Sequence, residues 1–253
     1  MFLIAGSGRS GTSAVAKLLH AAGLSAGHDL IEADASNPDG YFEERAVIRL
    51  NDRILADAGL QGRFARASRR QVIEAARPHE EEMRALAADA TPAWKDPRFS
   101  WTLEPWLAVL DEPPRVIVCL RSPAEVTAST MRYYGLVDEE SVRAAEHNWR
   151  GQYERLLEVI EDSGLDATCV EYSRLHEDPE ATADALSRLV GRKLDPSMVR
   201  RDLRHHAAAT PEHLADLYER VRQLNASRGA HRRRHAPDVT RPMPLHPPDH
   251  AAR

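Results

Sequence analysis

The sequence predicts an α/β protein of three layers, in which a central parallel sheet is flanked by helices on both faces. Three apolar, largely β-branched runs predict buried strands, at residues 2–6 (FLIAG), 115–121 (RVIVCLR) and 167–172 (ATCVEY). Segments with the spacing of amphipathic helices separate these runs, and strands that alternate with helices form parallel sheets. Such sheets bind ligands beyond the carboxyl ends of their strands.

Helical segments fill the first half of the chain between strands. A helix follows the first strand and ends at Gly23, a residue type that commonly closes helices. Helical spacing of Val, Leu and Ile residues returns from Glu43 to Gly59. Residues 67–90 are rich in Ala and charged residues, and they predict one or two helices interrupted near Pro78. A short strand at 93–95 and a helix over about 99–110 complete this half.

The second half repeats the alternation with clearer boundaries. Ser122-Pro123 has the residue types of a helix N-cap and first turn, directly after the strand at 115–121. A long helix is predicted over residues 139–162. After the strand at 167–172, a helix begins at the Asp178 cap and ends at Gly191, and residues 210–225 are also helical.

One domain is expected over residues 1–226, because a chain of 253 residues can form one sizeable core. Residues 227–253 are rich in Pro, His and Arg without an apolar period, which indicates a flexible tail or lid. No basic leader precedes an apolar segment, and no apolar run has the length of a membrane helix. We therefore expect a cytoplasmic protein with no membrane partner.

The charge balance argues against nucleic acid as a partner. The formal net charge is −5, and the basic tail leaves the body of the chain more acidic still. Nucleic-acid-binding domains are usually basic, so any anion site here must be a local concentration of cations and N–H groups. Cys119 and Cys169 lie in apolar runs and predict structural thiols. No Cys or His cluster has ligand spacing, so no metal site is predicted.

The stretch GSGRSGTS, residues 6–13, turns the first strand into a helix. Free N–H groups and the helix dipole attract phosphate at such a turn, and glycines let the backbone approach it closely. Arg9 adds a positive charge, and Ser10, Thr12 and Ser13 add hydroxyl groups. This composition predicts an anion-binding loop rather than an ordinary tight turn.

Two nucleotide motifs overlap in this loop, and neither is complete. Gly6, Gly8 and Gly11 fit the G-x-G-x-x-G pattern of dinucleotide-binding folds, but the acidic residues about 20 positions later follow a poor strand. The loop also has the G-x-x-x-x-G spacing of a Walker motif, with Thr12 where the lysine belongs. The strand at 115–121 ends in Arg121 rather than in an acid that would bind Mg²⁺, which favours an anion over a metal.

The loop and a second segment together resemble a known family. GSGRSGTS followed by RSPAEVTAS, in which Ser129 lies eight residues after Arg121, is similar to the two phosphate-binding segments of sulfotransferases that use 3′-phosphoadenosine 5′-phosphosulfate (PAPS). The resemblance implies a P-loop-like fold, with the 5′-phosphosulfate at the first segment and the 3′-phosphate at the second. It implies a set of co-substrate-binding residues: Gly8, Arg9, Ser10, Gly11, Thr12, Ser13, Arg121, Ser129 and Tyr172, the last near the adenine.

Two further stretches resemble catalytic segments of this family. WKDPR is similar to a short strand with a Lys near the sulfuryl group, and NPDGYFE to a bacterial segment with a prominent Glu. The implied catalytic residues are Glu43 as general base, with Lys95 and Arg9 neutralising charge on the leaving oxygen. Glu44 and Asp96 remain alternative bases.

Departures from the family leave other functions open. The aryl enzymes of the cytosol have Lys where this chain has Arg9, and a catalytic His where it has Pro97. A nucleotide kinase or other NTPase, a dinucleotide oxidoreductase and a non-catalytic nucleotide-binding protein therefore stay as alternatives. For a sulfotransferase, the acceptor would be a hydroxyl of a small molecule or a glycoside. The wall of the acceptor-binding site would come from residues 25–70 and 130–150. The aromatic side chains of these residues are Tyr41, Phe42, Phe64, Tyr133, Tyr134 and Trp149.

Overall fold

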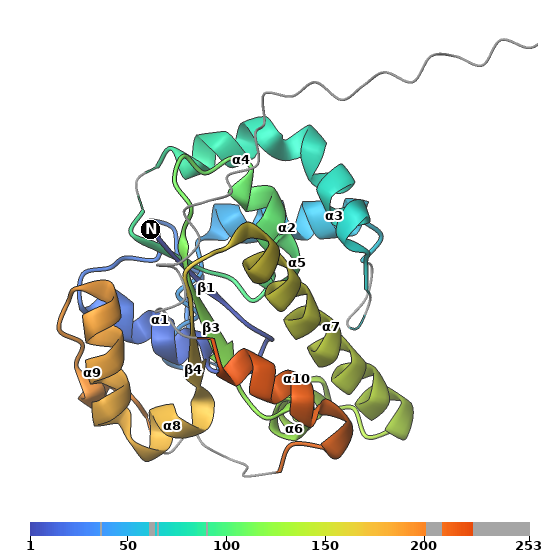
Figure 1. Ribbon diagram of the computed structural model, residues 1–253, viewed down its shortest axis with the longest axis vertical. Helices are drawn as coiled ribbons and strands as arrows, with labels where there is room; N and C mark the ends of the chain where they lie inside the picture. The colour runs from blue at the N-terminus through green and yellow to red at the C-terminus, as the bar shows by residue number, and fades with distance from the viewer. Residues whose placement is uncertain (36, 61–63, 65, 90, 201–208, 225–253) are drawn as a thin grey trace, which may run out of the picture.

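The computed structural model describes residues 1–35, 37–60, 64, 66–89, 91–200 and 209–224. Within them, one parallel sheet has four strands in the order β2-β1-β3-β4 (Figure 1). Its strands are β1 (Phe2–Ala5), β2 (Ala93–Lys95), β3 (Arg115–Leu120) and β4 (Ala167–Glu171). The first strand pairs with β2 on one side and β3 on the other, so the chain segments that follow these three strands emerge side by side. This confirms the predicted α/β class with a central parallel sheet.

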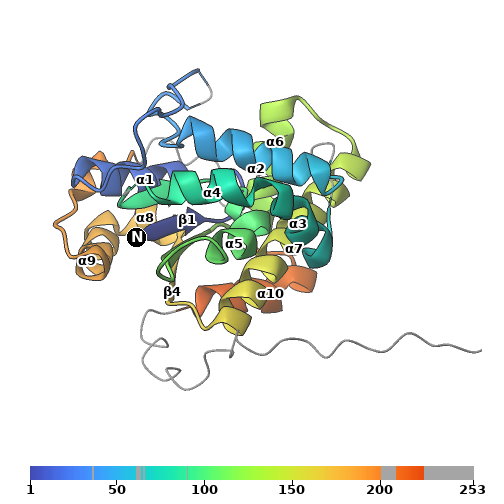
Figure 2. The ribbon, with the colours of Figure 1, turned by 90° about the horizontal axis from the view of Figure 1, so that it is seen from above.

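Side chains alternate between the two faces along each strand, so both faces of this sheet carry apolar residues. Helices cover both faces. Ile4 and Ile117 pack against α1 (Thr12–Ala21), α8 (Tyr172–Glu177) and α9 (Pro179–Val190). Leu3 and Val116 belong to the larger core on the other face. The helices of that core are α2 (Arg45–Asp57), α3 (Arg69–Ala76), α4 (Glu80–Ala87), α5 (Phe99–Leu107), α6 (Pro123–Tyr134), α7 (Glu139–Ser163) and α10 (Glu212–Arg222). Figure 2 shows α8 and α9 on one side and α3, α7 and α10 on the other.

Most of the predicted boundaries hold for local reasons. The Asp178 side chain caps α9 by accepting a hydrogen bond from the Ala181 N–H at 3.0 Å. Gly191, at the end of α9, has the left-handed conformation that closes a helix. The segment at 67–90 divides into α3 and α4 at a 3₁₀ turn, Arg77–His79, which contains Pro78 as predicted.

The strands predicted at 2–6, 115–121 and 167–172 each end one residue earlier than predicted, and the last of these ends bears on the cavity. The run ATCVEY was expected to be strand throughout, but β4 ends at Glu171 and Tyr172 begins the short helix α8. The chain turns here because the ring of Tyr172 packs against the loop after β1 and under Arg121. Tyr172 therefore lines the cavity instead of extending β4.

The structure bears on three other expectations. Cys119 is buried on β3, and burial raises the pKa of its thiol to about 12, as expected for a structural cysteine. Cys169 on β4 is half-buried. No helix in the described part of the chain is long and apolar enough to cross a membrane. The expected tail at 227–253 lies outside the described residues.

Candidate active site

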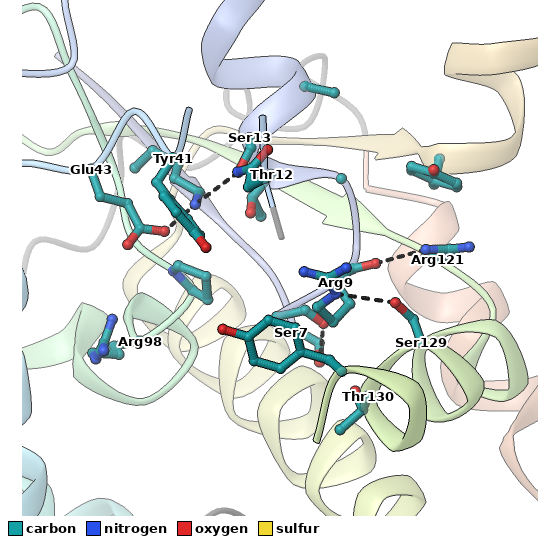
Figure 3. A pocket seen from close by; sticks show the side chains of 18 of the residues that line it. Ser7, Arg9, Thr12, Ser13, Tyr41, Glu43, Arg98, Arg121, Ser129 and Thr130 are labelled. Carbon is teal, nitrogen blue, oxygen red and sulfur yellow. Dashed lines mark hydrogen bonds and ion pairs between the residues drawn. The ribbon is translucent and has the colours of Figure 1, made fainter. Parts of the chain in front are cut away.

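A cavity of about 770 Å³ lies where the segments after β1, β2 and β3 meet. Figure 3 shows Arg9, Ser13, Glu43, Arg121 and Ser129 around it. Most of the predicted site residues line it, namely Gly8, Arg9, Gly11, Thr12, Ser13, Glu43, Lys95, Arg121, Ser129 and Tyr172. Three predicted or alternative residues do not line it: Ser10, Glu44 and Asp96. The sheet order therefore brings together segments that lie far apart in the sequence.

The loop after β1 needs glycine at two positions. Gly6 has φ 142°, and a Cβ there would lie 2.4 Å from the carbonyl oxygen of Cys119 on β3. Gly11 has φ 88°, and a Cβ there would lie 2.5 Å from the ring of Tyr172. Arg9 also has a positive φ, 68°, which is uncommon for a residue with a side chain and costs backbone energy. This conformation directs a charged residue into the cavity.

A buried tyrosine of α7 holds the loop in this shape. The Tyr153 hydroxyl oxygen lies 2.6 Å from the carbonyl oxygen of Cys119, 3.1 Å from Ser10 Oγ and 3.3 Å from the backbone nitrogen of Ser7. A phenol has one proton, and Cys119 takes it at the shortest distance, so Ser10 Oγ–H and the Ser7 N–H donate to the phenol oxygen. Burial raises the pKa of Tyr153, which keeps that proton in place.

Sequence reasoning missed Tyr153, because a tyrosine on the buried face of a long helix looks like an ordinary core residue. It also gave the Ser10 hydroxyl to the anion, whereas this hydroxyl points to Tyr153 and Ser10 is 1% exposed. Thr12 and Ser13 do line the cavity. Ser7 also lines the cavity, but its hydroxyl donates to the carbonyl oxygen of Gly8 at 3.3 Å, so Thr12 and Ser13 are the predicted loop hydroxyls that face a ligand.

The second predicted anion segment joins the loop through Arg9. The Nε of Arg9 donates to Ser129 Oγ at 3.1 Å, and Arg121 Nη1 donates to the carbonyl oxygen of Arg9 at 3.1 Å (Figure 3). The Arg121 guanidinium lies 4.1 Å above the ring of Tyr172 and pairs with Glu125 at 2.7 Å. The two segments thus form one continuous basic surface, and stacking and pairing fix the orientation of Arg121.

Glu43 and Lys95 form a buried ion pair at the end of β2. Glu43 is 8% exposed and Lys95 is 3% exposed. Burial raises the pKa of the Glu43 carboxyl, and the positive charge of Lys95 opposes the rise. Lys95 Nζ also donates to Ser13 Oγ at 3.3 Å, which connects the pair to the first turn of α1.

The segment before α2 sets the place of Glu43. Asn37 Nδ2 donates to Ser13 Oγ at 3.1 Å and to the carbonyl oxygen of Gly40 at 2.8 Å, and Asp39 pairs with Lys17 of α1 at 3.1 Å. Phe42, directly before Glu43, has a positive φ of 56°. Ser13 Oγ accepts from both Asn37 and Lys95, so its own proton remains for a third partner in the cavity.

The two alternative bases have other partners. Glu44 Oε2 accepts from the backbone N–H groups of His28 and Asp29, at 2.7 and 3.0 Å, and thereby holds the loop before α2. Asp96 is fully buried and accepts from Asn51 Nδ2 at 2.8 Å and from Arg98 Nη1 at 3.0 Å. Their oxygens stabilise neighbouring segments, whereas the Glu43 carboxyl faces the cavity.

Two expected wall residues lie elsewhere. Trp149 is completely buried, and its indole N–H donates to the carbonyl oxygen of Arg121 at 3.3 Å. Phe42 packs against His20 of α1 in the core on the other side of the sheet. The remaining aromatic side chains of the expected wall line the cavity: Tyr41, Phe64, Tyr133 and Tyr134. In the described part of the chain, no three His, Cys, Asp or Glu side chains are grouped as metal ligands.

The fold and the site define a P-loop-like α/β protein with a glycine-rich loop after its first strand that lines the cavity. The sequence matches the family model described as the sulfotransferase family over residues 2–196. The chain therefore belongs to the sulfotransferase family, whose reaction is transfer of a sulfuryl group. No curated protein sequence matches it.

Solved structures of sulfotransferase domains are similar in fold. The domain from the Synechococcus PCC 7002 olefin synthase has 18% identity and a TM-score of 0.51, with 87% of this chain and 93% of that chain covered. The domain from the curacin biosynthetic pathway has 17% identity and a TM-score of 0.49, with 85% and 81% covered. The first of these likenesses agrees with the P-loop-like arrangement seen here.

Proposed function

We propose that this protein transfers a sulfuryl group from PAPS to an alcohol hydroxyl. The observation that carries the proposal is the joining of the two anion-binding segments through Arg9, which contacts Ser129 and Arg121 at 3.1 Å each. PAPS has two separate anionic groups, at its 5′ and 3′ positions, and this surface offers cations to both. The residues present therefore fit the proposed co-substrate.

The loop and the Arg121 segment bind different anionic groups of PAPS. Backbone N–H groups at the start of α1, with Thr12 and the free proton of Ser13, bind the 5′-phosphosulfate. Arg121 and Ser129 bind the 3′-phosphate, and the ring of Tyr172, fixed against Arg121, lies beside the adenine. Bound PAPS supplies an activated sulfuryl group on a good leaving oxygen.

Glu43, Lys95 and Arg9 perform the remaining steps. The acceptor oxygen forms the new O–S bond while the S–O bond to the phosphate breaks, and the acceptor proton passes to the Glu43 carboxylate. Lys95 and Arg9 neutralise the charge that grows on the leaving phosphate oxygen. When Lys95 turns toward that oxygen, it releases Glu43 from their ion pair. Arg9 binds and stabilises charge, and its guanidinium does not give up a proton.

Transfer of radiolabelled sulfate tests this function. The protein is incubated with [³⁵S]PAPS and a mixture of hydroxyl-bearing compounds, and labelled products are separated and identified by mass. Label in an organic product from the wild-type protein, absent with Glu43→Gln, supports the proposal. Nucleotide binding without transfer favours the non-catalytic reading, and Mg²⁺-dependent ATP hydrolysis favours an NTPase. Tight NAD(H) binding would favour an oxidoreductase.

A further inference from the structure

The cavity differs in character between its two sides. Because β1 lies between β2 and β3, the segment after β2 and the segment after β3 lie on opposite sides of the glycine loop. In Figure 3, Glu43 and Arg98 lie on one side, and Arg121 and Ser129 lie on the other. We call these the acceptor side and the donor side. This naming rests on the proposed function, in which the donor anion occupies the basic side.

The acceptor side has an apolar wall. It consists of Leu55 near the end of α2, Leu60 and Phe64 beyond it, Pro97 after β2 and Trp101 of α5. Leu55 and Trp101 are buried, and the other three are half-buried. A ligand that covers Leu60, Phe64 and Pro97 removes their exposed apolar surface from water, which is the main source of affinity for an apolar body.

The acceptor side has no excess of positive charge. Arg98 pairs with Asp52 at 2.5 Å and with Asp96 at 3.0 Å, and Lys95 pairs with Glu43. Three carboxyl groups thus meet two cations, so these five groups carry no net positive charge. On the donor side the cations Arg9 and Arg121 outnumber the one acid that pairs with them, Glu125. An anionic acceptor would be attracted to the donor side of the cavity, away from Glu43 and the apolar wall.

We infer that the acceptor is an uncharged alcohol with an extended apolar body, whose hydroxyl lies at Glu43 and whose body lies along the wall from Leu55 to Trp101. A small sugar hydroxyl would leave this wall uncovered. An acceptor with a carboxylate, sulfate or phosphate on its body would oppose Asp52, whose side chain is 55% exposed at the side of the cavity. The inference names the acceptor class and adds no second reaction.

A series of primary alcohols tests the acceptor class. The kcat/KM for labelled transfer from PAPS is measured for straight-chain alcohols of increasing length and for the same chains with a terminal carboxylate. Each methylene that reaches the wall should raise kcat/KM about three- to fourfold until the wall is covered. The carboxylate analogues should be slower by about tenfold or more at equal length.

Variants of the wall locate the effect. Leu60→Ala and Phe64→Ala should flatten the length dependence, while the affinity for adenosine 3′,5′-bisphosphate, which binds on the donor side, should change by less than about threefold. Val137→Ala is the matched control, because Val137 is an apolar side chain that is 96% exposed and lies outside the cavity. Asp52→Asn should raise the relative rate with carboxylate analogues about two- to fivefold, because it removes one negative charge beside Arg98.

The outcomes separate this inference from the proposed function. Transfer that is independent of chain length, or faster with carboxylates than with neutral alcohols, overturns the acceptor class while sulfuryl transfer stands. Transfer to sugars alone has the same consequence. If the bisphosphate does not bind and no acceptor is labelled, the proposed function fails and the inference falls with it.

Discussion

Glu43 and Lys95 lie 52 residues apart in the sequence and form a buried ion pair between the segment before α2 and the end of β2. The pair places a carboxylate and a cation on the same cavity, and the proposed sulfuryl transfer uses one of each. In the proposed reaction, the donor anion attracts Lys95 away from the Glu43 carboxylate. Removing either residue should therefore affect the reaction in a different way.

Glu43→Gln should lower kcat by about 100- to 10,000-fold, because the amide cannot accept the acceptor proton. The affinity for adenosine 3′,5′-bisphosphate should change by less than about threefold, since the proposed nucleotide contacts lie on other residues. Labelled transfer gives kcat, and calorimetry gives the affinity. Glu44→Gln is the control on the neighbouring residue. Full activity in Glu43→Gln would mean that another group takes the proton.

The pH dependence of kcat should report the raised pKa of Glu43. The base works only when ionised, so kcat falls as the pH drops below this pKa, and the fall begins at a higher pH than for an ordinary glutamate. Lys95→Ala should move the acidic limb of the profile to still higher pH, because the opposing charge is gone, and lower the plateau. A limb at the same pH in both proteins would show that Glu43 does not control the profile.

Tyr153→Phe should weaken nucleotide binding through the loop. The change leaves the Ser7 N–H, the Ser10 hydroxyl and the Cys119 carbonyl without their shared partner, and the free energy of unfolding should fall by about 1–3 kcal/mol. The affinity for the bisphosphate should fall about tenfold, and kcat at saturating PAPS should change little. Tyr218→Phe, on α10 and outside the cavity, is the control for loss of a phenol hydroxyl. A loss of stability with unchanged nucleotide affinity would show that Tyr153 stabilises the core and does not shape the loop for nucleotide binding.

Gly11→Ala and Gly8→Ala form a matched pair in the same loop. Alanine at position 11 must adopt φ 88° with its Cβ 2.5 Å from the Tyr172 ring, and we expect a loss of about 2–3 kcal/mol in unfolding free energy. A Cβ at position 8 meets no heavy atom within 4 Å, so the loss there should stay below about 0.5 kcal/mol. Denaturant unfolding of both variants measures the difference. Equal losses would mean that the loop has another shape.

The sequence was sufficient for the strands of the sheet and for the edge of the sheet where the cavity lies. Strongly apolar runs mark β1 and β3, and glycine, proline and capping residues mark the helix ends, because these signals act within a few residues. The two segments predicted to bind anions could be placed at this edge because each directly follows a strand. The order of the strands then brings them together without any further signal.

The choice among Glu43, Glu44 and Asp96 could not be made from sequence. Glu43 and Glu44 directly precede α2, and Asp96 directly follows β2. Only tertiary contacts distinguish the three carboxyl groups. Asn51 and Arg98 bind Asp96, and two backbone N–H groups bind Glu44. Tyr153 was missed for the same reason, because it looks like an ordinary core residue until its distant partners are known. Tyr172 was predicted beside the adenine, but the turn into α8 that places it was not predicted.

The measurement that tests the central claim most directly compares adenosine 3′,5′-bisphosphate with adenosine 5′-monophosphate by calorimetry in one buffer. Recognition of two anionic groups predicts that the bisphosphate binds about 10- to 100-fold more tightly, since each charged hydrogen bond contributes about 1.5–3 kcal/mol. Arg121→Gln should remove most of this ratio and keep the affinity for the monophosphate. Equal affinities in the wild-type protein would contradict the assignment of PAPS as donor.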